Sequence, residues 1–162
     1  MRVKRAIGYG VLGAAAISVV SAGLRSVGLP IRLELLLGTV LGLYPSTAAF
    51  LVGLAMHLAI GGAFGLLYGW LFETVWNHGG AGAGMILGVL HAALIGMAVG
   101  LTPQFHPMVP QSIPDPGPFF ANVGTLGVIT FFGAHILYGA IVGHGYGHVA
   151  AEREWAPLSH RA

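Results

Sequence analysis

Four long stretches of apolar sequence without a charged residue limit what this chain can fold into more than any other feature. They cover residues 6–24, 46–72, 80–101 and 119–144. A helix that crosses a bilayer needs about 20 apolar residues, because the hydrocarbon core is about 30 Å thick. Each stretch is long enough to cross, so the sequence predicts an all-α fold, a four-helix transmembrane bundle.

The composition leaves no room for a separate soluble domain. Of the 162 residues, 56% are hydrophobic and 7% are charged, whereas a soluble domain carries roughly 25% charged residues. We therefore expect one integral membrane domain, residues 1–162, with the lipid bilayer around it. The basic side chains are scattered, which argues against a nucleic acid partner. The absence of cysteine excludes disulfides, thiolate metal sites and cysteine nucleophiles.

The positive charges near the ends of the stretches predict the orientation of the chain. Those on the side of the two termini outnumber those on the other side: Arg2, Lys4, Arg5, Arg153 and Arg161 against Arg25 and Arg32. Basic residues are enriched on the cytoplasmic side of membrane proteins. Both termini are therefore expected in the cytoplasm, with the chain in a bacterial-type inner membrane.

Two connecting segments are expected to lie outside the spans. Residues 30–44 are apolar but too short to cross, and we expect them to form a short interfacial or re-entrant helix that begins at Pro30. Residues 103–118 contain six prolines and predict a stiff, extended periplasmic loop that covers the bundle. Its His106, Met108 and Asp115 could contact a metal, although a rigid connector is the simpler interpretation.

An internal repeat relates the two halves of the chain. A shift of 78 residues aligns residues 10–17 with residues 88–95 at six identities in eight positions. The same shift aligns further pairs, among them His57 with His135, Gly61 with Gly139 and Tyr68 with Tyr146. We therefore predict two tandem two-helix repeats, residues 6–72 and 84–150, related by a two-fold axis along the membrane normal. Because the third stretch is an internal span, the repeat favours a helix over a cleaved secretory signal at the first.

Glycines recur at every fourth position within the stretches. The pairs with this spacing are Gly61 and Gly65, Gly84 and Gly88, and Gly139 and Gly143. Small residues at this spacing let membrane helices approach closely, because packing rather than water expulsion drives their association. These glycines are therefore predicted to be helix-packing seams.

Three histidines, His57, His91 and His135, are expected near the middle of the membrane. Polar groups at that depth are costly unless they have a partner. In the simplest interpretation each is a neutral imidazole bonded to a carbonyl, to Ser46 or Thr47, or to another histidine. In the alternative, His57 and His135 lie on diagonal helices as each other's nearest polar neighbours. They would then hold a haem b or, together with His91, a divalent metal.

A second group of polar residues is expected at the cytoplasmic helix ends. His144, His148 and Glu152 follow one another at intervals of four, and Glu73 and His78 end the second stretch at the same level. Imidazole and carboxylate at this spacing can form half of a divalent metal site. Solvated polar side chains at a helix end are the alternative interpretation.

Short motifs carry a resemblance to a known group of proteins. At Leu29-Pro30, His57-Leu-x-x-Gly61 and His135-x-x-Tyr-Gly139 the chain resembles the YagU-like group of small bacterial four-helix membrane proteins. The resemblance implies the architecture and the membrane location. It implies no reaction and no catalytic residue.

No arrangement of catalytic residues is visible in the sequence, so an enzyme is not expected. The sequence favours a non-catalytic, multi-pass inner-membrane protein that serves as an accessory subunit or assembly factor, with its glycine seams docking partner helices. The partners would be other membrane subunits or further copies of the chain. A haem b or metal-binding subunit for electron transfer or metal handling is the first alternative. A small channel or transporter is the second.

Overall fold

The computed structural model describes the backbone of residues 1–77 and 79–154, and the side chains up to Gly147. All the regular elements in this part of the chain are helical, which confirms the predicted all-α fold. In order they are α1 (Val3–Ser26), α2 (Leu33–Thr39), α3 (Thr47–Thr74), α4 (Ala81–Val99), α5 (Thr102–Phe105), the 3₁₀ helix η1 (Pro118–Val123) and α6 (Thr125–Glu154).

Four of these helices are long and apolar enough to cross a membrane. They are α1, α3, α4 and the part of α6 from Thr125 to Gly147, which confirms the four predicted spans. Large apolar side chains such as Leu12, Leu94 and Leu126 are more than half exposed on their outer surfaces. Lipid rather than water is the solvent that such a surface fits.

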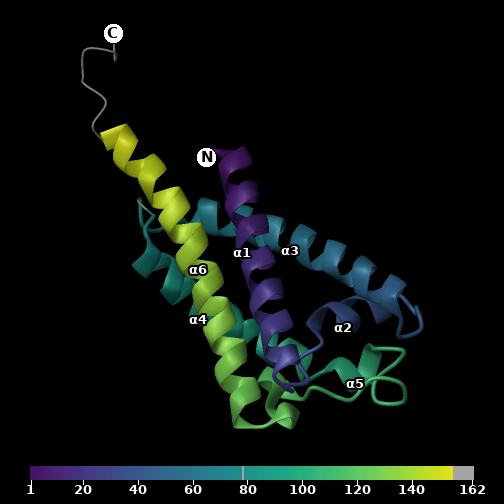
Figure 1. The fold of residues 1–162 in the computed structure, drawn as a ribbon. Helices are drawn as coiled ribbons and strands as arrows, with labels where there is room; N and C mark the ends of the chain where they lie inside the picture. The colour runs from purple at the N-terminus through teal and green to yellow at the C-terminus, as the bar shows by residue number, and fades with distance from the viewer. Residues whose placement is uncertain (78, 155–162) are drawn as a thin grey trace.

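The four long helices form a bundle in which α3 and α4 meet through side chains such as Phe64 and His91 rather than along their backbones, and we call this the open side of the bundle. α1 packs against both α3 and α6, and α4 packs against α6, but α3 and α4 do not pack along each other. The order around the bundle is therefore α3, α1, α6, α4. Figure 1 shows α3 and α4 close together near the turn that joins them and diverging from there.

Glycine brings α1 and α3 into backbone contact. A side chain added at Gly10 would overlap the carbonyl oxygen of Gly61, and one added at Gly65 would overlap the carbonyl oxygen of Ala6. One methyl group lies in this seam, because a Cβ on Gly61 would meet the Cβ of Ala14 at 2.5 Å. We call these contacts the α1–α3 seam.

In the seam between α4 and α6 the glycines face only backbone atoms of the other helix. Side chains added at Gly84 and Gly139 would each overlap the carbonyl oxygen of the other residue. One turn away, the backbone N–H of Gly80 donates a hydrogen bond of 2.9 Å to the carbonyl of Gly143. Gly88 faces the carbonyl of His135. We call these contacts the α4–α6 seam.

The helix between the first two spans differs from its prediction. α2 begins at Leu33 rather than at Pro30, and it is seven residues long. It lies directly on α3, because Gly38 faces the carbonyl of Ala49 and Gly53 faces the carbonyl of Glu34. These close contacts hold α2 against the bundle and bury part of its surface.

The prediction that the fourth span starts at residue 119 is wrong. Phe119 and Phe120 have φ angles of 56° and 61° and belong to η1, while α6 begins at Thr125. Both angles lie in the left-handed region, which an α-helix of L-residues cannot continue through. η1 packs against α4 and α6 and closes the end of the bundle between them.

The proline-rich segment is folded rather than extended. It begins with the single turn α5, and Val109 and Ile113 are buried in a small apolar cluster with Leu36 of α2. The His106 ring bonds through Nε2 to the carbonyl of Leu36 at 3.0 Å, and its Nδ1 accepts a hydrogen bond from the Met108 N–H. The rigid-connector interpretation fits His106 better than a metal site, because both ring nitrogens are already engaged.

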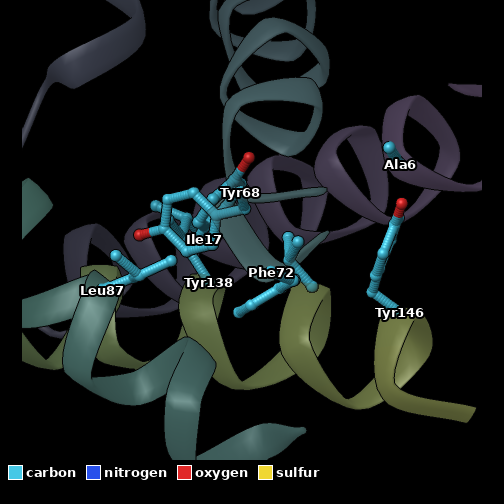
Figure 2. Packing of buried hydrophobic residues seen from close by; sticks show 8 residues of the cluster. Ala6, Ile17, Tyr68, Phe72, Leu87, Tyr138 and Tyr146 are labelled. Atoms are coloured by element: carbon cyan, nitrogen blue, oxygen red, sulfur yellow. The ribbon is translucent and has the colours of Figure 1, made fainter. Parts of the chain in front are cut away.

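Aromatic side chains fill the half of the bundle nearer the termini (Figure 2). Tyr68 meets Tyr138 edge-on with ring centroids 5.5 Å apart, and Phe72 lies 5.7 Å from Tyr146. The Tyr138 hydroxyl donates to the carbonyl of Gly61 at 2.5 Å. These aromatic contacts fill the core on the side of Gly61 and Tyr138 that faces the chain termini.

Candidate functional site

A cavity of about 220 Å³ lies where the long helices meet α2 and η1. Its wall is almost entirely apolar, and Phe64, Phe120 and Phe131 supply aromatic surface. The polar exceptions are few: Ser21, His57, His91, Thr130, His135 and Tyr138. The three histidines expected at mid-membrane therefore line one cavity, and we treat it as the candidate site.

His57 projects from α3 toward α1. Its Nδ1 shares a hydrogen bond of 3.0 Å with the hydroxyl of Ser18, and the residue is 9% exposed. Ser46 and Thr47 are among the partners that the sequence suggests for a mid-membrane histidine, but Ser46 instead caps the start of α3 by accepting a hydrogen bond from the Ala49 N–H. Ser18 was missed, although a hydroxyl within an apolar span is itself a signal, since it also needs a partner there.

His91 and His135 lie against each other from α4 and α6. Their ring centroids are 4.8 Å apart and their planes are nearly perpendicular at 84°. His135 Nδ1 donates a hydrogen bond of 2.8 Å to the carbonyl of Phe131. His91 Nδ1 lies 3.4 Å from the hydroxyl of Tyr68, and its ring stacks on Phe64 at 3.8 Å.

The prediction that His57 and His135 are each other's nearest polar neighbours is wrong. His57 bonds to Ser18, and the ring next to His135 is that of His91. The reason lies in the helix order, because α3 and α6 are diagonal and touch only slightly, whereas α4 packs along α6. Histidines on adjacent helices meet more readily than histidines on diagonal ones.

The three rings share one hydrogen-bonding arrangement. Each has Nδ1 engaged by the protein, and Nε2 has no hydrogen-bond partner within the described part of the chain. For His135 the direction is fixed, because a carbonyl only accepts and Nδ1 must donate. Its Nε2 is therefore an acceptor whenever the ring is neutral.

A three-histidine metal site is not formed. Among the described residues no three His, Asp or Glu side chains gather closely enough to hold one metal ion, so the set of His57, His91 and His135 does not act as one ligand group. The cavity is also smaller than the roughly 300 to 1,000 Å³ that houses drug-sized ligands. A haem is at least of that size, and it would fit only if the helices moved apart.

The predicted cluster at the cytoplasmic helix ends falls mostly outside the described residues. This applies to His78 and to the side chains of His148 and Glu152, whereas His144 is described and is exposed. Glu73 accepts a hydrogen bond of 2.6 Å from Tyr146 and pairs with the ammonium of Met1 at 2.9 Å. These contacts join the start of α1 to the ends of α3 and α6.

The predicted packing glycines lie inside the molecule. All six are buried, and each faces the backbone of a neighbouring helix or the methyl group of Ala14: Gly61, Gly65, Gly84, Gly88, Gly139 and Gly143. Their close contacts are therefore made within this chain.

Comparison of the chain with models of protein families, with curated proteins and with solved structures finds no significant match.

Proposed function

We propose that the protein binds a small, largely apolar molecule with a hydroxyl group, which enters the cavity from the bilayer. The observation that carries the proposal is the hydrogen-bonding state of the cavity wall. His135 presents an acceptor nitrogen to a space that is otherwise almost wholly apolar. Burying a polar group without a partner costs free energy, so a ligand that donates a hydrogen bond there is favoured.

A hydroxyl group fits this wall better than a carbonyl or a hydrocarbon. It can donate to Nε2 of His135 and can also accept a hydrogen bond from a neighbouring ring N–H. His91 is that neighbour, with its ring centroid 4.8 Å from the ring of His135. The volume of about 220 Å³ suits a ligand smaller than most drugs, such as a molecule with a single ring.

The open side of the bundle supplies a route from the lipid. Ile60 of α3 and His91 of α4 both line the cavity, and α3 and α4 do not pack along each other. Ile60 is 40% exposed, so the wall of the cavity reaches the lipid-facing surface. The main barrier on this side is Phe64, which lies flat on the ring of His91.

A protein that binds a ligand without catalysing a reaction fits the accessory role that the sequence favours. We place it in an inner membrane with both termini in the cytoplasm. Reporter fusions after Gly79 and within residues 103–118 should then lie on opposite sides of the membrane. The glycine seams are used within the chain, so a partner subunit would dock on other surfaces.

The proposal is tested with two ring compounds that differ by one hydroxyl group. Phenol should raise the melting temperature of the purified protein in mild detergent, and benzene at the same free concentration should raise it less. A His135→Phe variant keeps an aromatic ring but removes the acceptor, so the preference for phenol should disappear. A His144→Phe variant, changed outside the cavity, should keep it. Equal effects of phenol and benzene on the unchanged protein would contradict the proposal.

A metal ion held by His91 and His135 is a second candidate, supported by one observation. Histidines that ligate metals almost always bond through their other ring nitrogen to a protein group, and both rings have Nδ1 engaged in this way. Elemental analysis of the purified protein tests this candidate. One equivalent of zinc or copper, lost in His135→Phe and kept in His144→Phe, is the expected result. A metal-free protein that still prefers phenol would leave only the first candidate.

A further inference from the structure

A second cavity, separate from the histidine cavity, lies where α1 ends and α3 begins. Its volume is about 490 Å³, and it is lined by Arg25, Arg32, Leu35, Pro45, Ser46, Thr47 and Phe50. Two positively charged side chains therefore border one space at the end of two membrane spans. Such an end lies near the level of the lipid head groups.

Arg25 is held in place before any ligand binds. Its Nη1 donates to Oε2 of Glu34 at 2.9 Å and to the carbonyl of Ile31 at 3.2 Å, and its guanidinium lies 5.6 Å from the centre of the Phe50 ring. Glu34 is fully buried, so this ion pair has little freedom to move. The remaining N–H groups of Arg25 have no partner in the described part of the chain.

Arg32 has no hydrogen-bond or ionic partner among the described residues. It is exposed, and it also borders a cavity whose wall includes Asp115, but no ion pair joins the two. The two arginines that line the 490 Å³ cavity carry two positive charges, and the carboxylate of Glu34, which pairs with Arg25, carries one negative charge, so the net charge is +1. An anion is the ligand that this balance favours.

We propose that this cavity binds the phosphate of an anionic phospholipid between Arg25 and Arg32. Guanidinium groups match phosphate oxygens with paired hydrogen bonds, and the Thr47 hydroxyl can add one more. The apolar part of the wall, Leu35 and Phe50, offers a path for the glycerol and the first acyl carbons. A free phosphate ion would leave that part of the wall unused, so the same phosphate chemistry points to a lipid.

The test uses the full chain in mild detergent and native mass spectrometry. Added phosphatidylglycerol should be retained at one molecule per chain, whereas phosphatidylcholine, whose phosphate is neutralised by its own ammonium, should be lost at lower collision energy. Arg32→Gln should weaken retention of phosphatidylglycerol about tenfold, because one charged hydrogen-bond donor is removed. Arg32 is exposed, so this variant is expected to fold.

The matched control is Arg5→Gln, which removes the same charge at the opposite end of the bundle and should leave retention unchanged. Equal losses in the two variants would overturn the proposal, since the effect would then reflect net charge alone. Displacement of the lipid by an equal concentration of inorganic phosphate would also overturn it. Retention that depends on Arg32 and resists inorganic phosphate is the expected result.

Discussion

The two glycine seams are built alike but are placed differently along their helices. Gly61 of α3 and Gly139 of α6 hold the same place in the two seams, 78 residues apart, as in the sequence repeat. Gly10 of α1, however, has its packing counterpart in Gly84 of α4, 74 residues along the chain. The sequence repeat matches Gly10 with Gly88, so the two helix pairs differ by one helical turn.

This difference shows what a stripe of small residues specifies. Glycines at every fourth position fix which faces of two helices meet, but Gly80, Gly84 and Gly88 offer the same face at successive turns. Which of these turns packs against the neighbouring helix then depends on contacts elsewhere in the molecule. The duplication itself stays a prediction.

The one-turn shift also explains the different partners of the two repeated histidines. His57 meets the hydroxyl of Ser18. In the packing register the position equivalent to Ser18 is Ala92, which has no hydroxyl, and His135 bonds to its own helix and packs on His91 instead. His57 is therefore hydrogen-bonded to a side chain of the neighbouring helix α1, whereas His135 packs against the ring of His91.

The largest effect is expected in the α4–α6 seam, where the glycines face only backbone. Gly84→Ala should destabilise the protein by about 3 kcal/mol, because the added methyl group meets backbone that cannot turn aside. Unfolding in a rising fraction of SDS, followed by circular dichroism, measures the change. A loss below about 1 kcal/mol would show that α4 and α6 can separate without cost.

A smaller and repairable effect is expected in the α1–α3 seam. Gly61→Ala should cost about 2 kcal/mol, because its new methyl group meets the methyl group of Ala14 at 2.5 Å. Adding Ala14→Gly should recover roughly half of that loss. The same unfolding assay on the single and double variants tests this expectation, which fails if the second change has no effect.

Loss of the Ser18 hydroxyl should have a modest effect. Ser18→Ala removes the hydrogen bond to His57, and such bonds inside membranes contribute about 0.6 kcal/mol on average. The ring nitrogen signals of His57 in NMR spectra should shift while those of His135 stay in place. A shift at both histidines would mean that the two sites are coupled.

The smallest effect is expected at a glycine outside both seams. A Cβ on Gly8 of α1 would meet nothing within 4 Å, so Gly8→Ala should change the stability by no more than about 0.5 kcal/mol. A loss as large as that of Gly84→Ala would show that any methyl group on these helices is harmful. The comparison of the seams would then lose its basis.

The sequence predicted the four spans because each is recorded locally, in one uninterrupted apolar stretch. It also indicated the faces that pack, since the spacing of the glycines is a local property. It could not predict that α4 packs along α6 while leaving α3, because helix order depends on contacts between distant segments. The pairing of His135 with His91 follows from that order and was therefore missed.

Element ends were predicted less well where the backbone is unusual. Phe119 and Phe120 are apolar and look like part of a span, but their left-handed backbone places them in η1. The proline count predicted stiffness in residues 103–118 and gave no sign that Val109 would be buried against α2. The composition of a segment predicts the stiffness of its backbone, whereas its position in the fold depends on contacts with distant residues.

The open side between α3 and α4 makes the bilayer a part of the protein's tertiary structure. Three sides of the bundle are closed by packed helices, and on the fourth side, where Phe64 of α3 meets His91 of α4, the acyl chains of a surrounding bilayer would lie against the protein. In a bilayer, the lateral pressure of the lipids is expected to act on the spacing of α3 and α4, and through it on the volume of the histidine cavity. Under the proposed function, membrane thickness and fluidity are expected to change ligand affinity, so the same chain should bind the ligand differently in bilayers of different composition.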